Sequence, residues 1–200
     1  YTVNGKEKVV VACKDFTTHD TVLQDFASLK NTLIASTNNG YGTELPEILE
    51  AIRDQTAINP VELMRHFWDM FIVDAFIGNW DRHNGNWGFL YNSRTDEMTI
   101  APVYDCGSCL YPQADPSIME LPLEDPAEMD LRIFEIPLSG IRLNGQKIKY
   151  YDFISSLKYP GCNAALKRIT PRIDMKQICE LIDQTPYTTE LQKRFYKTML

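Results

Sequence analysis

The segment from Asn59 to Phe76 constrains the fold more than any other part of the chain. Asn59 is a favoured N-cap residue and Pro60 is favoured at the first helical position, so the pair predicts the start of a long helix. Its large apolar residues are not confined to one stripe, which is typical of a buried helix. They are Leu63, Met64, Phe67, Trp68, Met70, Phe71, Ile72, Val73, Ala75 and Phe76. We therefore expect this helix to form the centre of a mainly helical body, in a chain whose 200 residues suffice for one domain.

The N-terminal part of the sequence predicts a hairpin followed by a helix. Asn4-Gly5 suits a two-residue turn between residues 1–3 and a β-branched strand over residues 8–13. From Thr21 the pattern indicates a helix, because Thr21 and Gln24 fit a capping box. The apolar face of this expected helix consists of Val22, Phe26, Leu29, Leu33 and Ile34.

The rest of the chain predicts small hairpins inserted into a helical body. A polar loop over residues 36–43 leads to a short helix over 45–54. The later elements are strands over 87–91 and 98–101, an irregular stretch over 102–126, a hairpin over 142–149 turning at Asn144-Gly145, and helices from 151 to the end, with Thr170-Pro171 and Thr185-Pro186 as start signals. The expected fold class is therefore α+β, mainly α.

Charge and cysteine usage exclude some functions. The chain has 20 Lys and Arg against 27 Asp and Glu, a net charge of −7, which argues against direct binding of nucleic acid. The longest apolar stretch, 67–80, is interrupted by Asp69 and Asp74, so we expect no membrane span. Five scattered cysteines favour reduced thiols and a cytoplasmic protein.

A dense polar segment follows the central helix and is the best candidate for chemistry. Asp81 and Asn86 are five positions apart, a hairpin follows them, and Asp105 comes just after its second strand. Phosphoryl transfer needs a carboxylate to orient the attacking hydroxyl, and oxygen ligands that hold Mg²⁺ on the nucleotide phosphates. Protein kinases supply these groups in this order, as Asp-x-x-x-x-Asn, a hairpin and a metal-binding Asp before a glycine-containing turn. The pattern therefore predicts a phosphotransferase.

The same residues resemble a known family. Gly-Asn-Trp-Asp-Arg-His-Asn-Gly-Asn-Trp-Gly over 78–88, with Pro-Val-Tyr-Asp-Cys-Gly-Ser over 102–108, resembles the catalytic core of HipA-like serine/threonine kinases. The resemblance implies Asp81 as the catalytic base and Asn86 and Asp105 as Mg²⁺ ligands. It also implies that residues 1–16 are the last strands and hinge of a truncated N-lobe, and that 17–200 form the helical C-lobe with a small catalytic hairpin. The hinge backbone would meet the adenine of ATP at Ala12, Cys13, Lys14 and Phe16.

The front of the N-lobe is missing from this pattern. No glycine-rich loop precedes Lys14 and the chain opens at Tyr1 on a strand-and-turn signal, so we expect a piece of a longer polypeptide that binds ATP poorly by itself. The predicted function is an ATP- and Mg²⁺-dependent kinase acting on Ser or Thr of a protein substrate. An antitoxin-like partner is a further expectation from the resemblance. The alternative is a catalytically silent module that binds a nucleotide or a partner.

Neighbouring polar residues have simpler expected roles. We expect Arg82 to pair with a buried carboxylate and His83 to bond with a backbone group. Cys106 and Cys109 have the spacing of a redox pair but lack its expected helical context, so incidental thiols are the better interpretation. Residues 36–43, which include Ser36 and Thr37, are a linking loop or a phosphorylation target.

Overall fold

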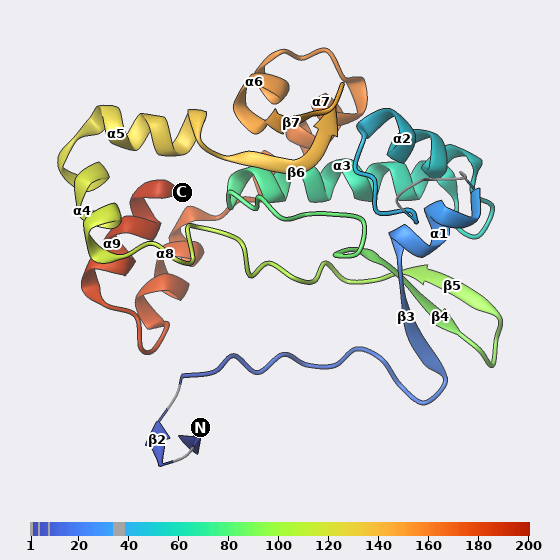
Figure 1. Cartoon of the computed structure of the whole chain (residues 1–200), viewed down its shortest axis with the longest axis horizontal. Helices are drawn as coiled ribbons and strands as arrows, with labels where there is room; N and C mark the ends of the chain where they lie inside the picture. Colours follow the sequence, from blue (N-terminus) through green and yellow to red (C-terminus); the bar gives the residue numbers. More distant parts are fainter. Residues whose placement is uncertain (1, 4, 8, 34–38) are drawn as a thin grey trace.

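The structure is a computed structural model that describes residues 2–3, 5–7, 9–33 and 39–200. It shows a helical body carrying a three-stranded sheet, with an N-terminal hairpin apart from both (Figure 1). Strands β1 (Thr2–Val3) and β2 (Lys6–Glu7) pair antiparallel across the predicted turn. The expected strand over 8–13 is wrong for the described residues 9–13, which have no regular structure and are exposed. Without a neighbouring strand, a β-branched run has no ladder to join.

The central helix is confirmed as α3 (Pro60–Phe76). Asn59 caps it, with its side-chain oxygen accepting hydrogen bonds from the backbone N–H groups of Val61 (2.9 Å) and Glu62 (3.4 Å). Helix α2 (Leu45–Asp54) has the predicted bounds, and α7 (Pro160–Ile169) packs along α3. The buried core gathers around α3, where Leu63, Phe67 and Phe71 are no more than 1% exposed. The predicted α+β class, mainly α, is confirmed.

The sheet has the order β3-β4-β5 and contains the main error of the prediction. Residues Thr21–Asp25, predicted as the start of a helix, form β3, which pairs antiparallel with β4 (Gly88–Asn92). Helix α1 (Phe26–Leu33) begins after them, and the Asp25 carboxylate accepts a hydrogen bond from the backbone N–H of Ser28 (2.8 Å). Pairing with a distant strand outweighed the local capping pattern. The position of Ile34 lies outside the described residues.

The two predicted hairpins are confirmed. Strand β5 (Glu97–Ile100) pairs with β4, and β6 (Leu138–Leu143) pairs with β7 (Gln146–Lys149) around Asn144-Gly145. The second hairpin lies beside the segment that leads into α2, because the Arg142 N–H donates to the carbonyl of Thr43 (2.8 Å). Helix α6 (Tyr150–Ser155) follows β7 directly.

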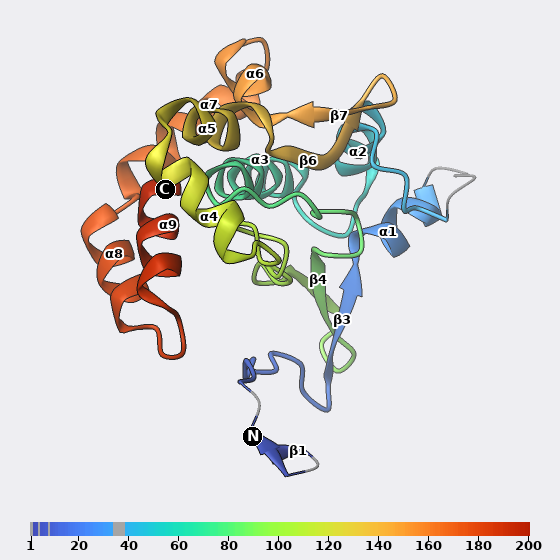
Figure 2. The same ribbon diagram turned by 60° about the vertical axis from the view of Figure 1, so that its left-hand side comes forward.

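The remaining helices gather at the C-terminal end of α3 (Figures 1 and 2). They are α4 (Pro116–Glu124), α5 (Pro126–Asp130), the π-helix η1 (Leu131–Glu135), the 3₁₀-helix η2 (Thr170–Arg172), α8 (Met175–Gln184) and α9 (Glu190–Met199). Two predictions here are wrong: α4 interrupts the stretch expected to be irregular, and Thr185-Pro186 starts no helix. Asp115, Asp174 and Thr189 supply the caps of α4, α8 and α9 instead. No helix among the described residues is long and apolar enough to cross a membrane.

Candidate active site

The loop between α3 and β4, residues 77–87, is anchored at its start by Asn79. Gly78 takes a left-handed backbone conformation (φ 61°) as the chain leaves the helix. The buried Asn79 side chain donates to the Asp74 carboxylate (2.9 Å) and accepts from the backbone N–H of Asp81 (3.1 Å). The Tyr150 hydroxyl donates to the carbonyl of Asn79 (2.6 Å). These bonds hold the backbone of Asp81 relative to α3 and α6.

The two candidate residues of this loop are joined by a hydrogen bond. The side-chain nitrogen of Asn86 donates to the carbonyl of Asp81 (3.0 Å). This bond leaves the side-chain oxygen of Asn86 as the atom that can face a ligand. Asn86 is 7% exposed, whereas the side chain of Asp81 is exposed. The loop thus presents an exposed carboxylate beside an amide that is held by a hydrogen bond.

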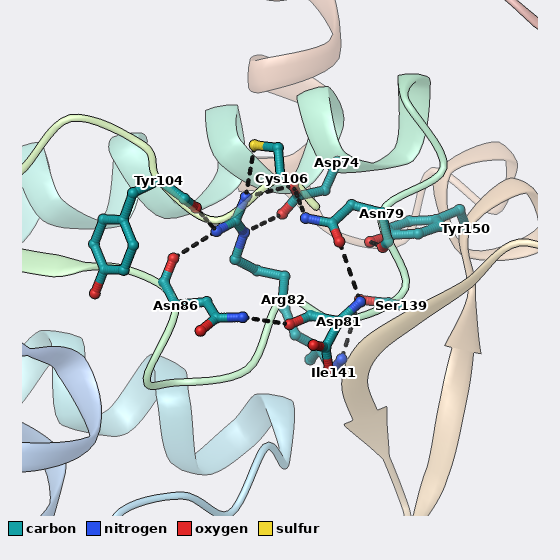
Figure 3. A network of polar contacts seen from close by, with 10 residues as sticks. All are labelled: Asp74, Asn79, Asp81, Arg82, Asn86, Tyr104, Cys106, Ser139, Ile141 and Tyr150. Carbon is teal, nitrogen blue, oxygen red and sulfur yellow. Dashed lines mark hydrogen bonds and ion pairs between the residues drawn. The ribbon is translucent and has the colours of Figure 1, made fainter. Parts of the chain in front are cut away.

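A single buried arginine connects this loop to the segment that carries Asp105 (Figure 3). Arg82 is 1% exposed and binds the Asp74 carboxylate through two nitrogens, at 2.9 and 3.0 Å. A third nitrogen donates to the carbonyls of Asn86 and Tyr104. The guanidinium therefore links α3, the end of the loop and the residue before Asp105. The predicted pairing of Arg82 with a buried carboxylate is confirmed.

The electrostatics of this pair follow from its burial. Burial raises the pKa of Asp74, and the hydrogen bonds of Arg82 and Asn79, together with the charge of Arg82, oppose that rise. For Arg82 burial acts to lower the pKa, but the hydrogen bonds and charge of Asp74 outweigh it and leave the pKa raised. The guanidinium therefore stays protonated, and its N–H groups can all donate to the carboxylate and the two carbonyls.

Asp105 follows an anchored residue and has an unusual backbone. Its φ is 53°, in the left-handed region that Asp and Asn tolerate better than most residues, and its side chain is exposed. The Tyr104 hydroxyl donates to the carbonyl of Gly85 (3.1 Å), while the Tyr104 carbonyl accepts from Arg82. Burial, together with the charge of Asp25, raises the pKa of Tyr104 to about 12, which keeps this donor protonated. Asp105 is thus fixed next to the loop of Asp81 and Asn86.

The predicted hinge residues are only partly brought to this site. The Phe16 ring lies 6.1 Å from the Tyr104 ring, centroid to centroid. Ala12, Cys13 and Lys14 are exposed, and among the described residues no hydrogen bond or ion pair joins their side chains to the 77–87 loop. The contact of the predicted hinge segment with this region is that of Phe16 with Tyr104.

Asn84 has a structural role that the sequence pattern did not predict. Its side-chain nitrogen donates to the carbonyls of Gly40 and Gly42, each at 2.8 Å, and the buried Lys30 donates to the same Gly42 carbonyl (2.7 Å). No local pattern predicts such a bond across more than 40 residues, although the three asparagines of the loop were a signal. The expected backbone bond of His83 is confirmed, since its ring nitrogen accepts from the N–H of Gly85 (3.0 Å). Ser36 and Thr37 lie outside the described residues.

The cysteine pair has an environment that is poor for redox chemistry. The Cys106 sulfur accepts a hydrogen bond from Arg82 (3.5 Å). Burial raises the pKa of Cys109 to about 12, which disfavours the reactive thiolate. Among the residues that the structure describes, no three His, Cys, Asp or Glu side chains form a group that could hold a metal. A metal at this site would need amide and nucleotide oxygens as additional ligands.

A helical body with a polar loop, a hairpin and a following aspartate defines a protein-kinase-like C-lobe. The family model of the HipA-like C-terminal domain matches residues 7–136, and the chain belongs to this family, as the sequence motifs predicted.

A curated protein and a crystal structure that are similar to this chain are both named CtkA. The chain is 50% identical over 196 residues to the serine/threonine-protein kinase CtkA of Helicobacter pylori, and the match covers 98% of this chain and 60% of CtkA. The crystal structure of the Helicobacter pylori proinflammatory kinase CtkA matches with a TM-score of 0.93 and 50% identity, over 97% of this chain and 71% of that one. The chain therefore spans about three-fifths of the length of its curated relative.

Proposed function

We propose that this chain is the C-lobe and hinge of an ATP- and Mg²⁺-dependent protein kinase that phosphorylates Ser or Thr. The observation that carries the proposal is the Arg82 guanidinium, which ties the loop of Asp81 and Asn86 to the residue before Asp105. Phosphoryl transfer depends mainly on such positioning of charged groups. The name of the 50% identical relative supports the same reaction class.

Each candidate residue has a role in this proposal. The exposed Asp81 carboxylate would orient the substrate hydroxyl and accept its proton. The side-chain oxygen of Asn86 and the Asp105 carboxylate would hold Mg²⁺, which neutralises charge on the nucleotide phosphates. Their chemistry fits this metal, because Mg²⁺ prefers oxygen ligands and the nitrogen of Asn86 is already bonded to Asp81. Arg82 is a positioning residue.

The proposal also assigns the two parts of the chain. Residues 1–16 would be the last strands and hinge of an N-lobe, and residues 17–200 would be the C-lobe. The backbone of Ala12, Cys13, Lys14 and Phe16 would meet the adenine, and the tilted ring contact of Phe16 with Tyr104, 6.1 Å between centroids, supports this placement. The substrate would be a protein; an antitoxin-like partner stays a prediction from the family resemblance.

Phosphate transfer from labelled ATP tests the proposal, using the full-length polypeptide that carries this sequence. We expect Asp81→Asn to reduce transfer by about 10²–10⁴-fold and to leave Mg²⁺-dependent nucleotide binding in place. Asp105→Asn should abolish both, since Asn tolerates the left-handed backbone but lacks the charge. Asp96→Asn is the matched control, because Asp96 is also exposed and left-handed (φ 55°) but lies in the β4–β5 turn.

Two results would contradict this function. Transfer that survives in both Asp81→Asn and Asp105→Asn would remove these residues from the reaction. Mg²⁺-dependent nucleotide binding without transfer by the unaltered polypeptide, tested on a mixture of protein substrates, would favour the silent binding module.

A further inference from the structure

We infer that a hollow on the face of β7, α6 and the start of α7 docks an acidic segment of the protein substrate that also carries apolar side chains. The inference rests on the proposed function for the identity of the partner as a substrate. It concerns a surface outside the candidate active site.

The hollow has an apolar floor and a basic rim. Its volume is about 600 Å³, and apolar side chains of Leu143, Ile148, Phe153 and Tyr159 line it. The side chains of Lys147, Lys149 and Lys158 lie around the same hollow and are exposed. Figure 1 shows β7, α6 and α7 grouped together on one side of α3. Such a mixture suits a peptide that offers both carboxylates and apolar groups.

The charge at this hollow is opposite to that of the chain as a whole. The residues that line the hollow include three Lys and one Asp, in a chain of net charge −7. The acidic groups that compensate the rim are Asp152, which lines the hollow, and Glu135, which pairs with Lys149 at 2.9 Å. Among the described residues, no ion pair engages Lys147 or Lys158. An acidic segment is therefore attracted here, while most of the molecule repels it.

A peptide explains these features better than a nucleic acid. Two lysines without a partner are few for a phosphate backbone, whose binding depends on many released counterions. A polyanion would also meet the negative potential of the rest of the chain. The half-buried Leu138, Leu143 and Tyr159 of the floor leave apolar surface that aliphatic side chains can contact.

The hollow is connected to the candidate active site through the β6–β7 hairpin. In β6 of this hairpin, a Cβ atom added at Gly140 would lie 2.8 Å from the carbonyl oxygen of Arg82. Tyr150, directly after β7, donates to the carbonyl of Asn79 in the same loop. A substrate docked in the hollow is therefore held on the hairpin that packs against the loop of Asp81.

Fluorescence anisotropy of short labelled peptides tests the docking surface without requiring catalysis. The probe is a peptide of Glu, Asp and Leu; Gln and Asn replace the acids in one control and Ser replaces Leu in the other. We expect the acidic, leucine-containing peptide to bind best and to weaken as salt is raised. Lys147→Glu with Lys158→Glu should weaken its binding about tenfold. The matched control is Arg172→Glu with Lys176→Glu, an equal charge change at exposed residues outside the hollow.

Three outcomes would overturn the inference. Equal weakening by both double variants would assign the binding to overall charge, and no binding of the acidic peptide would remove the site. Tighter binding of a labelled single-stranded oligonucleotide that depends on Lys147 and Lys158 would make the hollow a nucleic-acid site.

Kinetics separate this inference from the proposed function. In the full-length polypeptide, Lys147→Glu with Lys158→Glu should raise KM about tenfold for a Ser-containing peptide with an acidic, leucine-rich extension, and not for its neutral counterpart. Peptide binding without phosphate transfer would refute the kinase and keep the docking site. Transfer whose KM ignores both the extension and the lysines would refute the docking site and keep the kinase.

Discussion

Replacing Arg82 by Met tests whether one buried guanidinium assembles the candidate site. Arg82 and Asp74 are 1% and 2% exposed, so the substitution leaves a buried carboxylate whose remaining partner among the described residues is the amide of Asn79. Removing one partner of a buried pair costs about 3–5 kcal/mol. The carbonyls of Asn86 and Tyr104 lose their donor as well, which places the expected loss of unfolding free energy near the upper end, about 5 kcal/mol.

A second substitution separates charge burial from positioning. Asp74→Asn combined with Arg82→Met removes both charges and keeps an oxygen that can accept from Asn79. We expect the double variant to regain about 2 kcal/mol relative to Arg82→Met alone, because no unpaired charge is buried. Mg²⁺-dependent stabilisation by nucleotide should stay lost, since nothing holds the carbonyls beside Asn86 and Asp105.

Arg168→Met is the matched control for this comparison. Arg168 makes a similar double contact with Asp69, between α7 and α3, but the two side chains are 25% and 22% exposed. Its removal should cost about 1 kcal/mol and leave nucleotide binding unchanged. Urea unfolding gives the free energies, and thermal unfolding in the full-length polypeptide with and without Mg²⁺ and nucleotide gives the ligand response.

Three results would show that the buried guanidinium does not act in this way. Equal destabilisation by Arg82→Met and Arg168→Met would mean that burial does not set the cost. A double variant as unstable as Arg82→Met would mean that the buried charge of Asp74 is not the cause. Full nucleotide stabilisation in Arg82→Met would mean that the carbonyl bonds do not position the site.

Three smaller predictions concern packing, thiol reactivity and pH. Gly140→Ala should lower the free energy of unfolding in urea by about 1–3 kcal/mol, because its Cβ would lie 2.8 Å from the Arg82 carbonyl oxygen. Gly107→Ala should lower it less, because the atom nearest to its Cβ is 3.7 Å away. Equal losses in the two variants would contradict the packing argument. Burial raises the pKa of Cys109 to about 12 and that of Cys162 to about 11. At pH 8, iodoacetamide should therefore modify the exposed Cys13 and Cys106 first, as mapped by mass spectrometry. Faster labelling of Cys109 would refute this prediction. Burial lowers the pKa of His66, so the unfolded state binds a proton at this histidine more readily than the folded state does. The free energy of unfolding should therefore fall as pH drops through about 6.5. His66→Gln should flatten this part of the pH profile, and an unchanged slope would exclude His66 as the source of the pH dependence.

The sequence predicted those elements whose signals are local. The Asn59 cap with Pro60 placed the start of α3, and Asn144-Gly145, both with positive φ, placed the turn of the β6–β7 hairpin. β3 was missed because it exists through its register with β4, in which Thr21 pairs with Asn92. Because the partner strand is about 70 residues away, the five residues of β3 contain no local signal for the pairing, and their capping pattern was misleading.

In the candidate site, too, the local sequence pattern was predictable and the long-range contacts were not. The order of Asp81, Asn86 and Asp105 around a short hairpin was enough to select them, because chain order and topology are properties of the sequence. The hydrogen bonds that hold them were not predictable, because they join residues far apart in the sequence. Arg82 donates to the carbonyl of Tyr104, and Asn84 donates to the carbonyls of Gly40 and Gly42. Backbone carbonyls are present at every residue, so sequence alone cannot say which of them a side chain will find.

The loop from Asp81 to Asn86 nevertheless contains a regularity that explains how it works. Its even-numbered residues, Arg82, Asn84 and Asn86, are buried, while Asp81 is exposed and His83 is half-buried. Tight turns shape this loop: the N–H of His83 donates to the carbonyl of Asp81 (2.8 Å), and the N–H of Asn86 donates to the carbonyl of His83 (2.9 Å). The turned loop is anchored on one side and open on the other. The buried side makes hydrogen bonds to α3, to the segment before α2 and to the loop itself. In the proposed kinase, the Asp81 carboxylate therefore needs no anchor of its own, because its neighbours hold the backbone of the loop.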